Sequence, residues 1–107
     1  MTTLYVDYVT SDTLLDFGYN TYLVDATSNN VTLTLTDVSG GADGAAFQIS
    51  RVDSSGNLVF ITPQTGSLVN GLTASQLSTG GQLAPHQSVE LVVWTTNWYT
   101  LSDTWIQ

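Results

Sequence analysis

The sequence has 107 residues, no cysteine, and Arg51 as its sole lysine or arginine. Without thiols, neither a disulfide nor a thiolate metal site can form, and cysteine usage gives no indication of the redox compartment. Electrostatic binding of nucleic acid needs several Lys or Arg side chains to displace phosphate counterions. We therefore expect neither nucleic acid nor an anionic membrane as a partner.

Long apolar runs are missing as well. No apolar segment approaches the ~20 residues that a helix needs to cross a bilayer. Residues 1–7 lack the basic opening and apolar run of a secretory signal. Hydrophobic residues nevertheless make up 42% of the chain, which is too many for a disordered segment. The length suits one core, so the sequence predicts a single folded domain over residues 1–107.

The few charges are almost all negative. Nine Asp and Glu against one cation give a net charge of −8, and only 9% of the residues are charged. A chain without lysine makes little use of the charged residues that usually keep exposed strand edges apart. We therefore expect the strand edges to be covered, most simply by copies of the same chain.

The residues that are abundant favour strands. Val, Thr, Tyr, Leu and Ile dominate, turn residues recur, and no long stretch has clean helical spacing. The sequence predicts an all-β fold, an antiparallel β-sandwich or small barrel. Residues 1–21 are expected to hold an N-terminal arm and a first strand, with an irregular segment at 11–18. Residues 22–102 form the main β module, and residues 103–107 form a C-terminal tail.

Individual strands can be placed by alternation and by turn residues. In residues 31–36, strict alternation puts Val31, Leu33 and Leu35 on one buried face. Residues 47–52 and 58–62 flank a short loop rich in Asp, Gly and Asn, which predicts a β-hairpin.

Turn signals also mark the second half of the chain. Asn70-Gly71 is typical of a type I′ turn in a small second hairpin. A long strand is expected at residues 88–95, with a return strand at 98–101.

Two strands are apolar on both sides. Residues 58–61 are apolar at every position. In the strand at 88–95, the apolar residues Val92 and Trp94 lie on the second face. Such faces should be covered, by a partner subunit or by a packed loop. The sequence therefore predicts an oligomer or capsid interface that includes Leu58, Phe60, Val92, Trp94 and Arg51.

Arg51 has two interpretations. It can form an ion pair between subunits, or it can be a partly exposed strand residue paired with Asp53 or Glu90. The sequence leaves both open.

The aromatic residues near the C-terminus also allow two interpretations. Trp94, Trp98 and Trp105, with Tyr99, could form a platform for sugar rings. Aromatic residues on adjoining strands more often pack a core or a subunit interface, which is the interpretation we favour, with Trp98 in the core. Trp98, Tyr99 and Trp105 remain the candidate glycan platform.

Catalytic and metal-binding patterns are weak. Asp37 and Asp43 lie in a Gly-rich loop, but their spacing fails the calcium-loop pattern and suits turn formation. His86 has no second histidine or serine motif around it and is expected to be a loop residue after Pro85. Paired carboxylates for glycoside hydrolysis could arise by chance among nine acids. We expect no enzyme, no metal and no cofactor.

Residues 24–35, 47–55, 58–63 and 88–93, together with Asn97-Trp98-Tyr99, resemble a β-rich module of tailed-phage virion proteins. The module occurs in tail fibres, tail spikes and head-decoration proteins. The resemblance covers residues 22–102 and consists of strand alternation and turns, without a catalytic signature. The chain departs from the usual pattern at Thr36-Asp37, where a proline often follows the strand. It departs again at Thr95-Thr96, where a glycine is common.

The resemblance implies a role in the virion. A short chain that is nearly all module suits a capsid decoration, or cement, protein on the outer capsid surface that bridges neighbouring major capsid subunits. Ligands that bind only an assembled state stabilise it, and capsid three-fold positions favour a homotrimer. The alternative is a tail-fibre or tail-spike component that recognises a host surface glycan. A small hydrolase using carboxylates is a third possibility.

Overall fold

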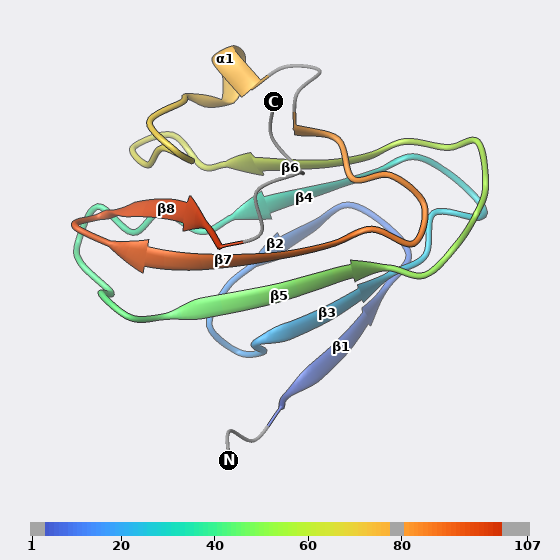
Figure 1. Ribbon diagram of the computed structural model, residues 1–107, viewed down its shortest axis with the longest axis horizontal. Coiled ribbons are helices and arrows are strands. Elements are labelled where there is room, and N and C mark those ends of the chain that lie inside the picture. Colours follow the sequence, from blue (N-terminus) through green and yellow to red (C-terminus); the bar gives the residue numbers. More distant parts are fainter. Residues whose placement is uncertain (1–3, 78–80, 102–107) are drawn as a thin grey trace.

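Eight strands and one short helix make up the computed structural model, which describes residues 4–77 and 81–101 (Figure 1). Within these ranges no helix is long and apolar enough to span a bilayer. The elements are β1 (Val6–Val9), β2 (Thr13–Leu15), β3 (Thr21–Val24), β4 (Val31–Leu35), β5 (Ala46–Arg51), β6 (Val59–Pro63), α1 (Ala74–Leu77), β7 (Ser88–Trp94) and β8 (Asn97–Thr100).

The strands form two sheets that enclose one core. The first sheet has five strands in the order β1-β3-β5-β7-β8, and the second has three in the order β2-β4-β6. From β1 to β6 the chain alternates between the sheets, so that each strand pairs with the strand two places away in the sequence. The predicted all-β, sandwich-like architecture is confirmed at this level.

Strand direction differs from the prediction. The pairs β1–β3, β3–β5, β2–β4 and β4–β6 are parallel, and antiparallel pairing is confined to β5–β7 and β7–β8. Parallel neighbours need a crossover connection, and here each crossover is a strand of the opposite sheet. Two consecutive strands, one in each sheet, therefore form one turn of a coil. The first turn consists of β1 and β2, and each of these strands is an edge of its sheet.

The hairpin predicted across residues 47–62 is wrong. β5 pairs with β3 and β7 in the first sheet, whereas β6 pairs with β4 in the second. Residues 52–58 are therefore an arch that carries the chain from one sheet to the other. Turn-forming Asp, Gly and Asn residues suit an arch as well as a hairpin, so the local sequence did not distinguish them.

Other local predictions are confirmed. β4 buries Val31, Leu33 and Leu35 and leaves its threonines half-buried. Asn70 and Gly71 have φ angles of 50° and 83°, and the flanking Val69 and Leu72 exchange backbone hydrogen bonds of 2.9 and 2.8 Å. These features define the expected tight turn.

The N-terminal part is more regular than expected, since the irregular segment at 11–18 contains β2. Leu15 of this strand is fully buried. The turn between β7 and β8 is Thr95-Thr96, one residue earlier than predicted.

Aromatic rings fill the middle of the core. Phe47 stacks on Trp98 with ring centroids 5.0 Å apart, and Tyr22 meets Phe47 edge-on at 5.4 Å. Trp98 is completely buried, as predicted, and its indole N–H donates to the carbonyl of Thr36 at 3.1 Å. The Tyr22 hydroxyl donates to the carbonyl of Asp16 at 3.0 Å, and burial raises the pKa of Tyr22 to about 12. Buried polar tips are thus satisfied by backbone groups of the loops.

Candidate functional site: the outer face of β7 and β8

Arg51, predicted at a subunit interface, lies inside the chain. Its guanidinium donates to both carboxylate oxygens of Asp53, at 3.0 and 3.1 Å. It also donates to the carbonyls of Leu83 at 2.9 Å and Asn57 at 2.7 Å. Of the two partners that the sequence left open, Asp53 and Glu90, the structure pairs Arg51 with Asp53, and the arginine is buried where partial exposure was expected. Arg51 is therefore removed from the interface residues.

Asp53 joins two arches through this pair. Its Oδ1 accepts from the N–H of Ala26 at 2.9 Å, and its Oδ2 accepts from the N–H and hydroxyl of Ser55. The hydrogen bond from Arg51 holds the pKa of Asp53 far below its ordinary value, against the opposing effect of burial. The carboxylate therefore stays ionised and ties the β3–β4 connection to the β5–β6 arch.

The outer side of β7 and β8 carries exposed apolar side chains. Val92 pairs with Tyr99 on β8 and with Ala46 on β5, while Trp94 pairs with Asn97. Trp94 is 61% exposed and Tyr99 is 39% exposed, with Val92 half-buried between them. Because alternate residues of a strand share a face, Val92, Trp94 and Tyr99 lie on one side of the sheet. We call these three residues the outer β7–β8 face.

Leu58 and Phe60 belong to the other layer. Phe60 is half-buried on the outer side of β6 and makes an isolated bridge to Gln82, while Leu58 is exposed just before the strand. The predicted interface residues therefore do not form one surface. Phe60 lies on the second sheet and Leu58 just before it, Val92 and Trp94 lie on the first sheet, and Arg51 is buried.

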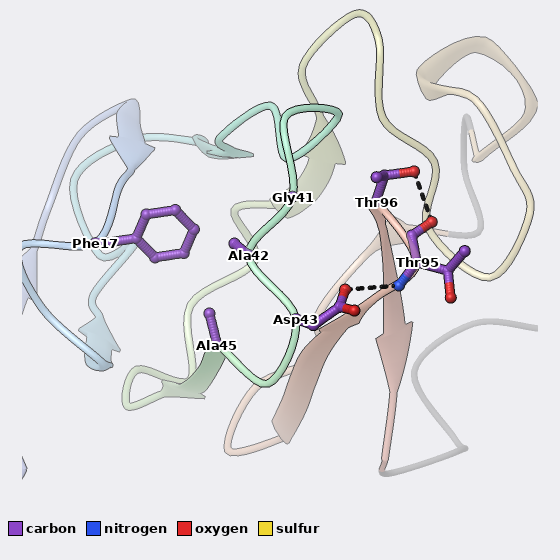
Figure 2. Close-up of a pocket in the computed structure, with 7 residues that line it drawn as sticks. All are labelled: Phe17, Gly41, Ala42, Asp43, Ala45, Thr95 and Thr96. Carbon is purple, nitrogen blue, oxygen red and sulfur yellow. Dashed lines mark hydrogen bonds between the residues drawn. The ribbon is translucent and has the colours of Figure 1, made fainter.

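A shallow hollow lies at the end of β7, next to the outer β7–β8 face. Its volume is about 550 Å³. Figure 2 shows the Phe17 ring and the side chains of Ala42 and Ala45 on one side, and the Thr95-Thr96 turn on the other. The Asp43 carboxylate accepts from the N–H of Thr95 at 2.8 Å. The lining residues are Phe17, Gly41, Ala42, Asp43, Ala45, Thr95 and Thr96.

The hollow brings together few groups that could take part in a reaction. Asp43 is its one ionisable residue and is engaged in holding the turn. Nucleophilic catalysis would need a base beside the hydroxyl of Thr95 or Thr96, and the hollow offers no histidine or second acid. The apolar lining residue Phe17 lies on the inner side of the first sheet, where its ring centroid is 5.7 Å from that of Phe47 and 6.4 Å from that of Trp98.

The acids of the Gly-rich loop organise turns. Asp37 accepts from the N–H of Ser39 at 2.9 Å and from the hydroxyl of Ser67 at 2.8 Å. The backbone hydrogen bond from Ser39 is the main reason why the pKa of Asp37 lies below its ordinary value. In the part of the chain that the structure describes, no three His, Cys, Asp or Glu residues gather as metal ligands would. His86 lies in an exposed loop with a φ of 61°.

The structure changes which residues could form the predicted glycan platform. Trp98 is buried and cannot stack on a sugar, Tyr99 is exposed, and Trp105 lies outside the described residues. Of the two tryptophans within residues 4–77 and 81–101, Trp94 is the one exposed to solvent. Alternation along β7 indicated its outward direction, whereas the hollow beside it was not visible in the sequence because its walls come from three separate segments.

No protein-family model, no curated protein and no solved structure matches this chain.

Proposed function

We propose that this chain is a structural protein of a phage virion. Its role is that of a capsid decoration protein, which binds the outer capsid surface as a trimer and stabilises contacts between major capsid subunits. The virion role depends on the resemblance of residues 22–102 to phage modules. The mode of action depends on one observation, which is that Trp94 and Tyr99 are exposed on the outer β7–β8 face.

An exposed Trp–Tyr pair of this kind is typical of an interface. Aromatic residues are enriched in the centres of protein interfaces, where each buries a large area with few rotamers to fix. Val92 lies opposite Tyr99 and two residues before Trp94, on the same face of the sheet. Together they offer an aromatic and aliphatic contact region, with the half-buried Glu90 next to Val92 on the same side of β7.

Introducing a charge at the centre of this face tests the proposal. Val92→Asp should leave a folded chain that assembles and binds capsids poorly, because a carboxylate between subunits loses its hydration without a cation partner. Thr34→Asp, on the outer side of the opposite sheet, is the matched control and should assemble and bind normally. Capsids of the encoding phage, prepared without this protein, serve as the target in co-sedimentation.

Two results would contradict the proposal. One is a light-scattering mass equal to a single chain together with no binding of the wild type to capsids. The other is normal assembly and capsid binding by Val92→Asp, which would leave the outer β7–β8 face without a role in assembly.

Glycan recognition in a tail fibre or tail spike is the second candidate, and the exposure of Trp94 and Tyr99 also favours it. Sugar rings stack on exposed aromatic side chains, and the two rings lie on one face. Calorimetric titration with the host surface polysaccharide should then give a signal that Trp94→Ala abolishes. Absence of heat with the wild type, or normal adsorption of particles that lack the protein, would remove this candidate.

A further inference from the structure

The two sheets differ in how their edges are protected. Residues 68–72 cover the β8 edge, with hydrogen bonds of 2.9 Å from the N–H of Trp98 to the carbonyl of Leu68 and from the N–H of Asn70 to the carbonyl of Trp98. The β6 edge is covered by Gln82 and Leu83. Within residues 4–77 and 81–101, no strand pairs with the outer edge of β1 or of β2.

The free backbone groups of β1 can be identified. The carbonyl of Tyr5 accepts from the N–H of Thr21 at 3.1 Å, and the carbonyl of Val9 accepts from the N–H of Asp25 at 2.9 Å. Backbone groups of a strand alternate in direction, so Tyr5, Asp7 and Val9 face β3. The N–H and C=O groups of Val6 and Tyr8 therefore point away from the sheet and form a template for another strand.

Residues 4–21 contain no proline and no lysine, the two residues most often used to protect an edge strand. The charged residue of β1 is Asp7, which is half-buried on the inner side of the strand. The side chains of Val6 and Tyr8 are 48% and 55% exposed on the outer side of the sheet. Figure 1 shows β1 at the end of its sheet, at the opposite side from β8.

The charges near β1 decide which kind of strand fits. Asp7 is half-buried on β1, and Asp25 accepts a hydrogen bond of 2.7 Å from the Tyr8 hydroxyl. Asp12 and Asp16 flank β2 in the same turn of the coil. A second copy pairing with β1 so that Val6 faces Tyr8 of the other chain would put the two Asp7 side chains opposite each other, and like charges there are destabilising.

We propose that the β1 edge is a docking site for an extended, basic segment of another protein, which adds as a sixth strand to the five-stranded sheet. Main-chain hydrogen bonds to Val6 and Tyr8 supply the pairing, and Lys or Arg side chains on the inner face of the segment lie beside Asp7. This site is separate from the outer β7–β8 face, so it can be tested without capsids.

A synthetic peptide that alternates Lys with Val and Thr is the probe, and its binding to the full chain is followed by fluorescence anisotropy. It should bind at low ionic strength and protect the amides of Val6 and Tyr8 from hydrogen exchange. The same peptide with Glu in place of Lys, and a Lys peptide with alternate amides methylated, should not bind. Binding by the methylated peptide would overturn the proposal, because it would show charge attraction without strand pairing.

Variants of β1 provide a second test of the proposal. Val6→Pro removes the outward N–H and should lower the affinity for the Lys peptide about tenfold. Val6→Ala keeps that N–H and is the matched control. Asp7→Asn should weaken binding at low salt and have little effect at high salt. Equal affinities for Val6→Pro and Val6→Ala would overturn the proposal. So would slow exchange of the Val6 and Tyr8 amides in the free protein, which would mean that the edge is already covered by a second copy or by another part of the chain.

Discussion

Arg51 and Asp53, two residues apart in the sequence, form a buried bidentate ion pair within one chain. The side chains are 2% and 3% exposed, and the Nε–Oδ1 distance is 3.0 Å. Arg51 ends β5 and Asp53 is the second residue of the arch to β6, so the pair lies where the chain leaves one sheet for the other. A buried pair of this kind is costly to break, because either partner alone is a charge removed from water without compensation.

We expect Asp53→Asn to lower the free energy of unfolding by about 3–5 kcal/mol, because it leaves the Arg51 guanidinium buried without an anion. Urea unfolding followed by tryptophan fluorescence measures this. Glu90→Gln, a change from acid to amide on the outer side of β7, is the matched control and should change stability by less than about 0.5 kcal/mol. A loss below about 1 kcal/mol for Asp53→Asn would contradict the role given to the pair.

The same pair makes stability depend on pH at the acid end. The pKa of Asp53 is lowered mainly by the Arg51 hydrogen bond, and hydrogen bonds from Thr27 and Ser39 lower the pKa values of Asp25 and Asp37. The folded protein therefore binds protons less readily than the unfolded chain, whose carboxyls titrate near 3.8. The resulting stability is present above that value and is lost as the pH falls below it.

We therefore expect the urea midpoint to be constant from neutral pH down to about pH 5 and to fall steeply below about pH 4. Asp53→Asn, which has no carboxyl at this position, should show a shallower fall than the wild type. Parallel pH profiles for the two proteins would mean that other acids cause the acid sensitivity.

The sequence predicted the features that depend on neighbouring residues. Alternation in β4 identified its buried face, Asn70-Gly71 identified a tight turn, and Trp98 was correctly assigned to the core. Each of these depends on only a few adjacent residues. The outward position of Trp94 followed from the same reasoning along β7.

Strand pairing was not predictable in this way. An arch and a hairpin use the same turn residues, and the contacts that select the arch are distant in the sequence, such as Asp53 with Ala26 and Arg51 with Leu83. The burial of Arg51 did have a signal in the sequence. Phe47 and Ile49 face inward on β5, so alternation places Arg51 on the same side, although a charged residue is rarely fully buried unless it is paired.

Trp98 and Trp94 differ by four residues and should differ sharply in their contribution to stability. Trp98→Phe leaves a cavity in the core and removes the donor to the Thr36 carbonyl, so we expect a loss of about 2–4 kcal/mol. Trp94→Phe keeps an aromatic ring at an exposed site and should change stability by less than about 0.5 kcal/mol. Thermal unfolding of both variants measures the difference. Similar losses would show that Trp94 is covered in the folded protein.

The β7–β8 turn offers a stabilising change. Thr95 and Thr96 have φ angles of 53° and 64°, a conformation that costs a β-branched residue about 1–2 kcal/mol. Asn-Gly is the preferred pair for such a turn. Thr95→Asn with Thr96→Gly should therefore raise the free energy of unfolding by about 1–2 kcal/mol, while the Asp43 hydrogen bond to the backbone N–H of residue 95 is kept.

Thr34→Gly, in the middle of β4, is the control for glycine itself and should lower stability by about 0.5–1 kcal/mol. The hydroxyl of Thr96 donates to the carbonyl of Thr95 at 2.6 Å, and this bond opposes the gain in the double variant. If the double variant is no more stable than the wild type, the hydroxyl compensates for the strained backbone. In that case, Thr96→Ser, which keeps the hydroxyl without the β-branch, should be more stable than the wild type.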